Sequence, residues 1–128
     1  MNLLNLQPAF SDHRGHIIDL VTNEEINAVT IVTFTKGAVR ANHYHKQTIQ
    51  WNYVMSGEIL LATQNPGEEK HERVLKEGDF VITPANERHA LKGLTDAKML
   101  VLTKGLRAGL EYESDTFRLD VPLINPNA

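Results

Sequence analysis

Short runs of β-branched and aromatic residues, separated by turn residues, most limit the folds open to this chain. Residues 27–35 (NAVTIVTFT) alternate and are rich in Val, Ile and Thr, which is typical of a half-buried strand. Further strands are expected at 16–21, 39–45, 49–55, 58–63, 71–75, 80–83, 89–91 and 98–103. No amphipathic helix pattern is longer than two turns. Short strands at such regular spacing predict an all-β sandwich or barrel.

Length and composition point to one domain over residues 1–128, since 128 residues can bury one core but not two. The net charge of −3 gives no reason to expect nucleic acid or an anionic membrane as a partner. There is no cysteine, which excludes disulfides and thiolate metal sites. Neither a signal peptide nor a membrane-spanning run is recognisable, so we expect a cytoplasmic protein. The expected partner is a small-molecule substrate, on the strength of the candidate site residues described next.

Residues 37–57 (GAVRANHYHKQTIQWNYVMSG) carry most of the chemistry. His43 and His45 are two positions apart, so in a strand their imidazoles lie on the same face. Such a pair forms half of a metal site or an acid/base pair. Gln50 lies on the next expected strand and shares a face with Asn52, whose amide we expect to meet the hydroxyl groups of a ligand.

Residues 78–93 (GDFVITPANERHALKG) add His89 as a third imidazole. With Gln50 as a neutral fourth ligand, His43, His45 and His89 suit Zn, Fe, Ni, Mn or Cu. In the alternative without metal, His43 and His45 act as acid and base, and Arg40 holds a phosphate through its planar guanidinium. Arg40 is equally consistent with a surface charge on a strand.

The two stretches resemble the paired motifs of the cupin superfamily. Three positions depart from those motifs: Gln50 stands in place of Glu, Asn86 in place of Gly, and Gly93 in place of Asn. All other motif positions are retained at the family's spacing: Gly37, His43, His45, Gly57, Gly78, Pro84 and His89. The resemblance implies a double-stranded β-helix, that is, a jelly-roll barrel with a site in its mouth. It also implies a homodimer formed by exchanged or abutting edge strands.

A narrower resemblance is to cupins that act on nucleotide-linked sugars, the ketoisomerases and 3,5-epimerases. It rests on Asp12-His13-Arg14-Gly15 and on Gly37-Ala38-Val39-Arg40 leading into the histidine pair. In the ketoisomerases a Gln can replace the usual Glu, and the histidines work without metal. We therefore expect a sugar isomerase or epimerase. The alternatives are a metal-dependent dioxygenase and a non-catalytic cupin that binds a metal or small molecule. The tail, residues 104–128, is expected to pack on the barrel or on a partner subunit.

Overall fold

In a computed structural model, which describes residues 1–105 and 113–127, the described residues fold into short strands joined by turns and loops. Among these residues no helix has the length and apolar character needed to span a membrane. The strands are β1 (Asn2–Leu4), β2 (Phe10–Asp12), β3 (Gly15–Ile17), β4 (Ala28–Phe34), β5 (Val39–Tyr44), β6 (Ile49–Ser56), β7 (Ile59–Gln64), β8 (His71–Leu75), β9 (Phe80–Thr83), β10 (Arg88–Gly93), β11 (Ala97–Lys104) and β12 (Phe117–Arg118).

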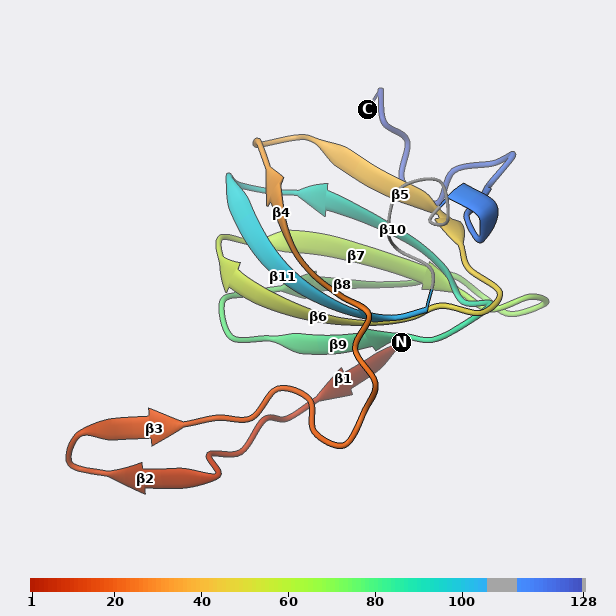
Figure 1. Cartoon of the computed structure of the whole chain (residues 1–128). Helices are drawn as coiled ribbons and strands as arrows, with labels where there is room; N and C mark the ends of the chain where they lie inside the picture. Colours follow the sequence, from red (N-terminus) through yellow and green to blue (C-terminus); the bar gives the residue numbers. More distant parts are fainter. Residues whose placement is uncertain (106–112, 128) are drawn as a thin grey trace.

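The strands form two five-stranded antiparallel sheets that face each other (Figure 1). The first sheet has the order β1-β9-β6-β11-β4, and the second has the order β12-β5-β10-β7-β8. Apart from the β7–β8 hairpin, neighbours in each sheet are not consecutive in sequence, as where β11 lies between β4 and β6. This arrangement confirms the predicted jelly-roll barrel, because from β4 to β12 the strands otherwise alternate between the two sheets.

The space between the sheets is apolar at one end and polar at the other. Along β6 the inward side chains are Gln50, Asn52 and then Val54, all buried. Val54 belongs to the hydrophobic core, which also contains Phe34, Ile59, Leu61, Leu75, Val81, Leu91, Ala97, Met99 and Val101. The barrel is therefore closed by apolar packing at one end, while polar side chains line the other.

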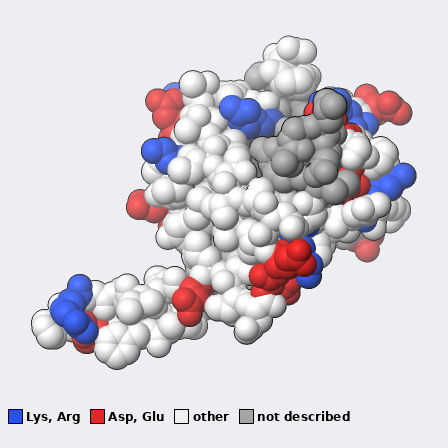
Figure 2. Space-filling model, viewed as in Figure 1, with Lys and Arg blue, Asp and Glu red and all other residues white. Residues whose placement is uncertain are grey.

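The hairpin of β2 and β3 stands away from the barrel (Figure 1). Its apolar side chains Phe10 and Ile17 are 52% and 59% exposed. The outer face of the first sheet also carries exposed apolar groups, since Val29 and Ile31 of β4 are 63% and 59% exposed. Figure 2 shows few charged side chains over this side of the barrel, with charges at the tip of the hairpin.

The described part of the tail, residues 113–127, packs against the second sheet. β12 pairs with β5, so that Phe117 lies opposite Tyr44 and Arg118 lies opposite His43. Further along, Ile124 is buried in a small cluster with Ala62 and Ala90. The tail thus contacts the strand that carries the first two histidines.

Candidate active site

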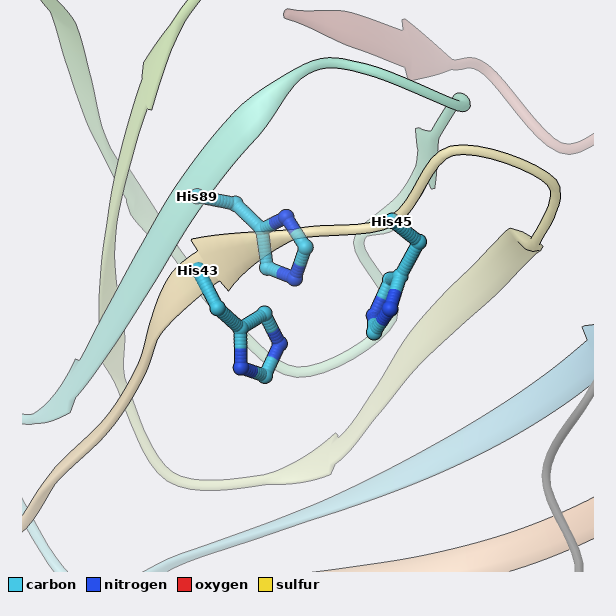
Figure 3. A group of neighbouring side chains, drawn as sticks. All are labelled: His43, His45 and His89. Carbon is cyan, nitrogen blue, oxygen red and sulfur yellow. The ribbon is translucent and has the colours of Figure 1, made fainter. Parts of the chain in front are cut away.

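Three histidines meet at the polar end of the barrel (Figure 3). His43 lies on β5 directly opposite His89 on β10, and His45 follows the end of β5. The ring centroid of His43 lies 4.8 Å from that of His45 and 4.7 Å from that of His89. One nitrogen of each ring lies within 4.8 Å of the others. The fold thus brings together the three imidazoles that the sequence analysis grouped.

An irregularity in β5 directly precedes the histidines. Ala41 and Asn42 both have left-handed backbone conformations, with φ of 70° and 58°. At the same place the register between β5 and β10 shifts, between His89 and Ala90. An extra residue of this kind bends a strand and redirects the side chains that follow it. The bulge therefore affects the direction in which the His43 side chain points from β5.

Backbone carbonyls fix the protonation pattern of two of the rings. Nδ1 of His45 lies 2.7 Å from the carbonyl oxygen of Asp115, and Nδ1 of His89 lies 3.1 Å from that of Glu87. A carbonyl oxygen can only accept a hydrogen bond, so each Nδ1 carries the proton. Nε2 is then the nitrogen with a lone pair in the neutral ring, and it is the atom available to bind a metal or a proton.

Burial keeps two of the imidazoles neutral. It lowers the pKa of His43 to about 3, helped by the neighbouring His89, His45 and Arg118. It also lowers the pKa of His89 to about 4; the hydrogen bond to Glu87 opposes this shift, and His45 adds to it. Both rings are thus uncharged near neutral pH, which is the form that binds metal ions or accepts protons.

A cavity of about 270 Å³ opens beside these histidines. His43 and His89 line it, whereas His45, which is also buried, is not among the lining residues. Three other predicted site residues, Arg40, Gln50 and Asn52, line the same cavity. Its remaining wall is mostly apolar and consists of Thr30, Val32, Phe34, Ala41, Leu91, Met99 and Val101.

Two residues predicted to bind the substrate, Asn52 and Arg40, form hydrogen bonds within the protein. Nδ2 of Asn52 donates to the carbonyl of Val81 at 3.1 Å and to the hydroxyl of Thr83 at 2.9 Å. Nε and one Nη of Arg40 donate to the carbonyl of Thr33 at 3.1 and 3.0 Å. These bonds fix the orientation of both side chains at the cavity wall, so any ligand meets them already placed.

Asp115 is a site residue that sequence reasoning did not single out. Its carboxylate accepts hydrogen bonds from the backbone N–H groups of Lys46 and Gln47 and from the Thr48 hydroxyl. Burial alone would raise the pKa of Asp115, but these bonds outweigh it and the pKa is lowered. No local signal could reveal this role, because Asp115 and His45 are 70 positions apart.

The motif at residues 12–15 lies at the tip of the β2–β3 hairpin, outside the cavity lining. There Nη2 of Arg14 pairs with the Asp12 carboxylate at 2.7 Å on the surface. Within one chain, therefore, the hairpin and the histidines occupy separate parts of the molecule.

The donor set fits a metal ion. Three imidazoles, two of them fixed with Nδ1 protonated, offer neutral nitrogen ligands of the kind that first-row divalent ions prefer. Among the described residues no Asp or Glu joins this group. Gln50, the predicted fourth ligand, is buried and lines the same cavity as His43 and His89.

Comparison with known proteins agrees with this geometry. The family model for the cupin domain matches residues 30–103, which is more than half of the chain and includes all three histidines. The chain belongs to the cupin family. A probable oxalate decarboxylase of Arthroderma benhamiae is 30% identical over 86 residues, which are 67% of this chain. This cupin spans only 21% of that relative's length.

Solved structures of sugar-modifying enzymes share the fold. The TDP-quinovose 3,4-ketoisomerase of Campylobacter jejuni is 25% identical with a TM-score of 0.76, covering 91% of each chain. The dTDP-4-dehydrorhamnose 3,5-epimerase of Sulfolobus tokodaii is 15% identical with a TM-score of 0.73, covering 98% of this cupin and 86% of the epimerase. At 15% identity the likeness to the epimerase shows the fold alone.

Proposed function

We propose that this cupin is an isomerase or epimerase that acts on a carbohydrate, in particular on a keto sugar linked to a nucleoside diphosphate. The observation that carries the proposal is that two neutral histidines, His43 and His89, line one cavity together with other polar side chains. The similarity in fold to sugar ketoisomerases and epimerases supports it. The motif at residues 12–15 and the Gln at position 50 add to this support.

The reaction requires a proton to leave the carbon next to a carbonyl and another to be returned, at a different position in an isomerase or on the opposite face of the same carbon in an epimerase. In our proposal His43 accepts the first proton, since it lines the cavity and its ring is neutral near pH 7. The ring of His45, with its centroid 4.8 Å from that of His43, completes the acid/base pair. Arg40 and Asn52 orient the sugar and its phosphate through the polar groups that they keep at the wall.

The cavity volume suits one sugar ring. At about 270 Å³ it falls just below the roughly 300–1,000 Å³ of pockets that enclose a drug-sized ligand. A nucleotide would therefore extend from the mouth of the cavity. Arg40, which is exposed, lies in the wall and is suited to a phosphate in that position.

An exchange assay tests this function. The protein would be incubated in D₂O with a TDP-linked 4-keto sugar, and proton NMR would follow deuterium entering the carbons beside the carbonyl. We expect exchange and isomerisation with the wild type and a loss of at least 100-fold in His43→Asn, because the base is removed. His71→Asn, at an exposed histidine, is the matched control. Binding of TDP without exchange would instead favour a non-catalytic binding protein.

The second candidate is a metal-dependent enzyme, such as a dioxygenase. The observation in its favour is that the nitrogens of His43, His45 and His89 lie close enough together to share one ion. Such an ion would supply Lewis acidity or redox chemistry, and Gln50 would complete the ligand set. The partial match to a probable oxalate decarboxylase is consistent with this candidate.

Elemental mass spectrometry of untagged protein separates the two candidates. A near-stoichiometric transition metal that disappears in the His43→Ala/His45→Ala variant would establish the metal site. Protein that stays free of metal after incubation with Zn²⁺, Fe²⁺, Ni²⁺, Mn²⁺ and Cu²⁺ would exclude it, and the histidines would remain as acid and base.

We also propose that the working unit is a homodimer. Val29 and Ile31 lie opposite Leu102 and Leu100, so the outer face of the first sheet is apolar across two adjacent strands. The β2–β3 hairpin is exposed on its own, and a lone two-stranded hairpin is at best marginally stable in water. Packing both against a second copy would bury them.

A further inference from the structure

The C-terminal segment holds the turn that follows the histidine pair. The Asp115 side chain is almost fully buried, and its carboxylate accepts bonds of 2.9 Å from Lys46 N, 3.0 Å from Gln47 N and 2.7 Å from Thr48 Oγ1. The carbonyl of the same residue accepts the Nδ1–H of His45 at 2.7 Å. One residue therefore binds four consecutive positions of the chain, 45 to 48.

Aromatic contacts fasten the same segment to the barrel. Phe117 stacks on Tyr44 with ring centroids 5.3 Å apart. The ammonium of Lys46 lies 4.3 Å from the Phe117 centroid, and the guanidinium of Arg88 lies 3.7 Å from the Tyr44 centroid. These contacts come from β5, β10 and the tail, so they fix where the backbone of Asp115 lies.

Asn42 adds a second attachment on the other side of His43. Its Oδ1 accepts the N–H groups of Leu123 and Ile124 at 2.8 and 3.2 Å, and its Nδ2 donates to the Ile124 carbonyl at 2.9 Å. The N–H of Leu119 also donates to the Asn42 carbonyl. The tail thus holds the histidine strand at both ends of the His43–His45 pair.

We propose that Asp115 is the positioning residue of His45: its carboxylate clamps the turn at residues 46–48, so that its carbonyl holds the Nδ1–H of the imidazole and Nε2 faces the other two histidines. The expected effect on activity rests on the proposed function, because it assumes that His45 takes part in catalysis. The expected tautomer of His45 is independent of the proposed function.

The physical reason is the cost of losing a buried acceptor. Without the carboxylate, two partly buried backbone N–H groups at residues 46 and 47 and the buried hydroxyl of Thr48 lose their partner. The turn and residue 115 would then separate, and Nδ1 of His45 would lose the carbonyl that makes it the protonated nitrogen.

Long-range ¹H–¹⁵N NMR spectra of the imidazoles test this assignment on chelator-treated, metal-free protein at pH 7.5. The signals of His45 are identified by their absence in His45→Gln. In the wild type we expect a protonated Nδ1 and an unprotonated Nε2. In Asp115→Ala we expect the two nitrogens to shift toward a mixture of tautomers. Asp120→Ala, which removes an exposed carboxylate from the same segment, should keep the wild-type pattern.

Thr48→Val serves as a milder variant in case Asp115→Ala does not fold, since it removes only one bond to the carboxylate. A measurable shift toward the mixed pattern in folded Thr48→Val or Asp115→Asn supports the proposal. An unchanged Nδ1–H tautomer of His45 in every folded variant at positions 48 and 115 overturns it.

Activity gives the second readout. In the sugar exchange assay we expect Asp115→Ala to lower kcat by about 10–100-fold, as for other residues that orient a working histidine. A tautomer change together with inactive wild-type protein would leave this inference standing and reject the proposed sugar chemistry. A wild-type kcat in a variant whose tautomer has changed would overturn the functional part of the inference.

Discussion

His43 and His89 show at the scale of single residues how burial prepares a site. Both rings lie between the two sheets, where a positive charge is poorly solvated, and the pKa values fall to about 3 and about 4. Because of the same burial, protonation of these rings lowers the free energy of unfolding. In the unfolded chain these rings take up a proton near pH 6.5, whereas in the folded protein they resist it.

The stability of the protein should therefore decrease as the pH falls. The unfolded state binds more protons than the folded state from about pH 6.5 down to the folded values of about 4 and 3, so the free energy of unfolding declines across this window. Each group contributes up to about 1.4 kcal/mol per pH unit. Urea unfolding of metal-free protein between pH 7.5 and 4 measures the slope. His43→Asn should make it shallower, while His71→Asn should not; equal slopes in all three proteins would contradict the prediction.

Gly57 is a second residue whose identity is set by its surroundings. Its φ is +80°, and a Cβ atom built there would collide with the carbonyl oxygen of Asp96 and would lie 2.8 Å from the Cα of Ala97. Both are backbone atoms, which cannot move aside cheaply. Both features explain why the last position of the first cupin motif, Gly57, requires glycine in this protein.

Gly57→Ala should destabilise the protein by about 3 kcal/mol or more, because steric overlap adds to the cost of a left-handed backbone. Gly67→Ala is the matched control: its φ is +77°, but nothing lies within 4 Å of the added atom. It should cost only about 1 kcal/mol. Thermal or urea unfolding of the two variants compares them directly, and similar losses would refute the steric explanation.

At the scale of elements, β5 is the strand on which the site depends. It pairs with β10 on one side and with β12 of the tail on the other. Ala41 and Asn42 adopt left-handed conformations that cost energy in residues with a side chain, and Asn bears this cost better than most. The three side-chain hydrogen bonds between Asn42 and the tail hold the bulge in place.

Asn42→Gly tests the value of these bonds without adding backbone strain, because glycine accepts a φ of 58° freely. We expect a loss of about 1–3 kcal/mol in unfolding free energy, from the backbone N–H groups of Leu123 and Ile124 that lose their acceptor. Asn42→Ala should lose about 1 kcal/mol more, since it adds strain at the same φ. If Asn42→Gly is as stable as the wild type, the tail attachment contributes little.

At the scale of the whole molecule, the apolar outer face of the first sheet and the exposed β2–β3 hairpin favour a second copy as partner. Large exposed apolar patches in soluble proteins mark interaction surfaces. Self-association through one shared face gives a closed pair with two-fold symmetry. The motif at residues 12–15, which lies on the hairpin, would then be carried toward the neighbouring subunit.

Val29→Glu should convert the proposed dimer to a monomer, because it places a charge on the exposed apolar face that the second copy would cover. Val74→Glu is the matched control, since Val74 is also exposed (39%) but lies on β8 of the other sheet. Sedimentation velocity at micromolar concentration distinguishes the species. A monomeric wild type, or a Val29→Glu variant that remains dimeric, would contradict the proposed interface.

The sequence by itself determined the class of fold and most of the polar side chains that line the cavity. Strand periodicity is local, because it depends on alternate side chains along one segment. The motif spacing placed His43, His45, Gln50 and His89 on or directly after strands that a cupin brings together. The alternation along β6 also indicated correctly that Gln50 and Asn52 share the inner face.

Only the tertiary structure decided how the histidines are held. The contact of the Asp115 carbonyl with His45, the bulge at Ala41 and Asn42, and the burial of His45 depend on contacts between segments far apart in the chain. Burial, and with it the low pKa of His43 and His89, is likewise a property of the packed sheets. A local pattern of residues cannot encode these features, because they come into being when the two sheets and the tail close around the site.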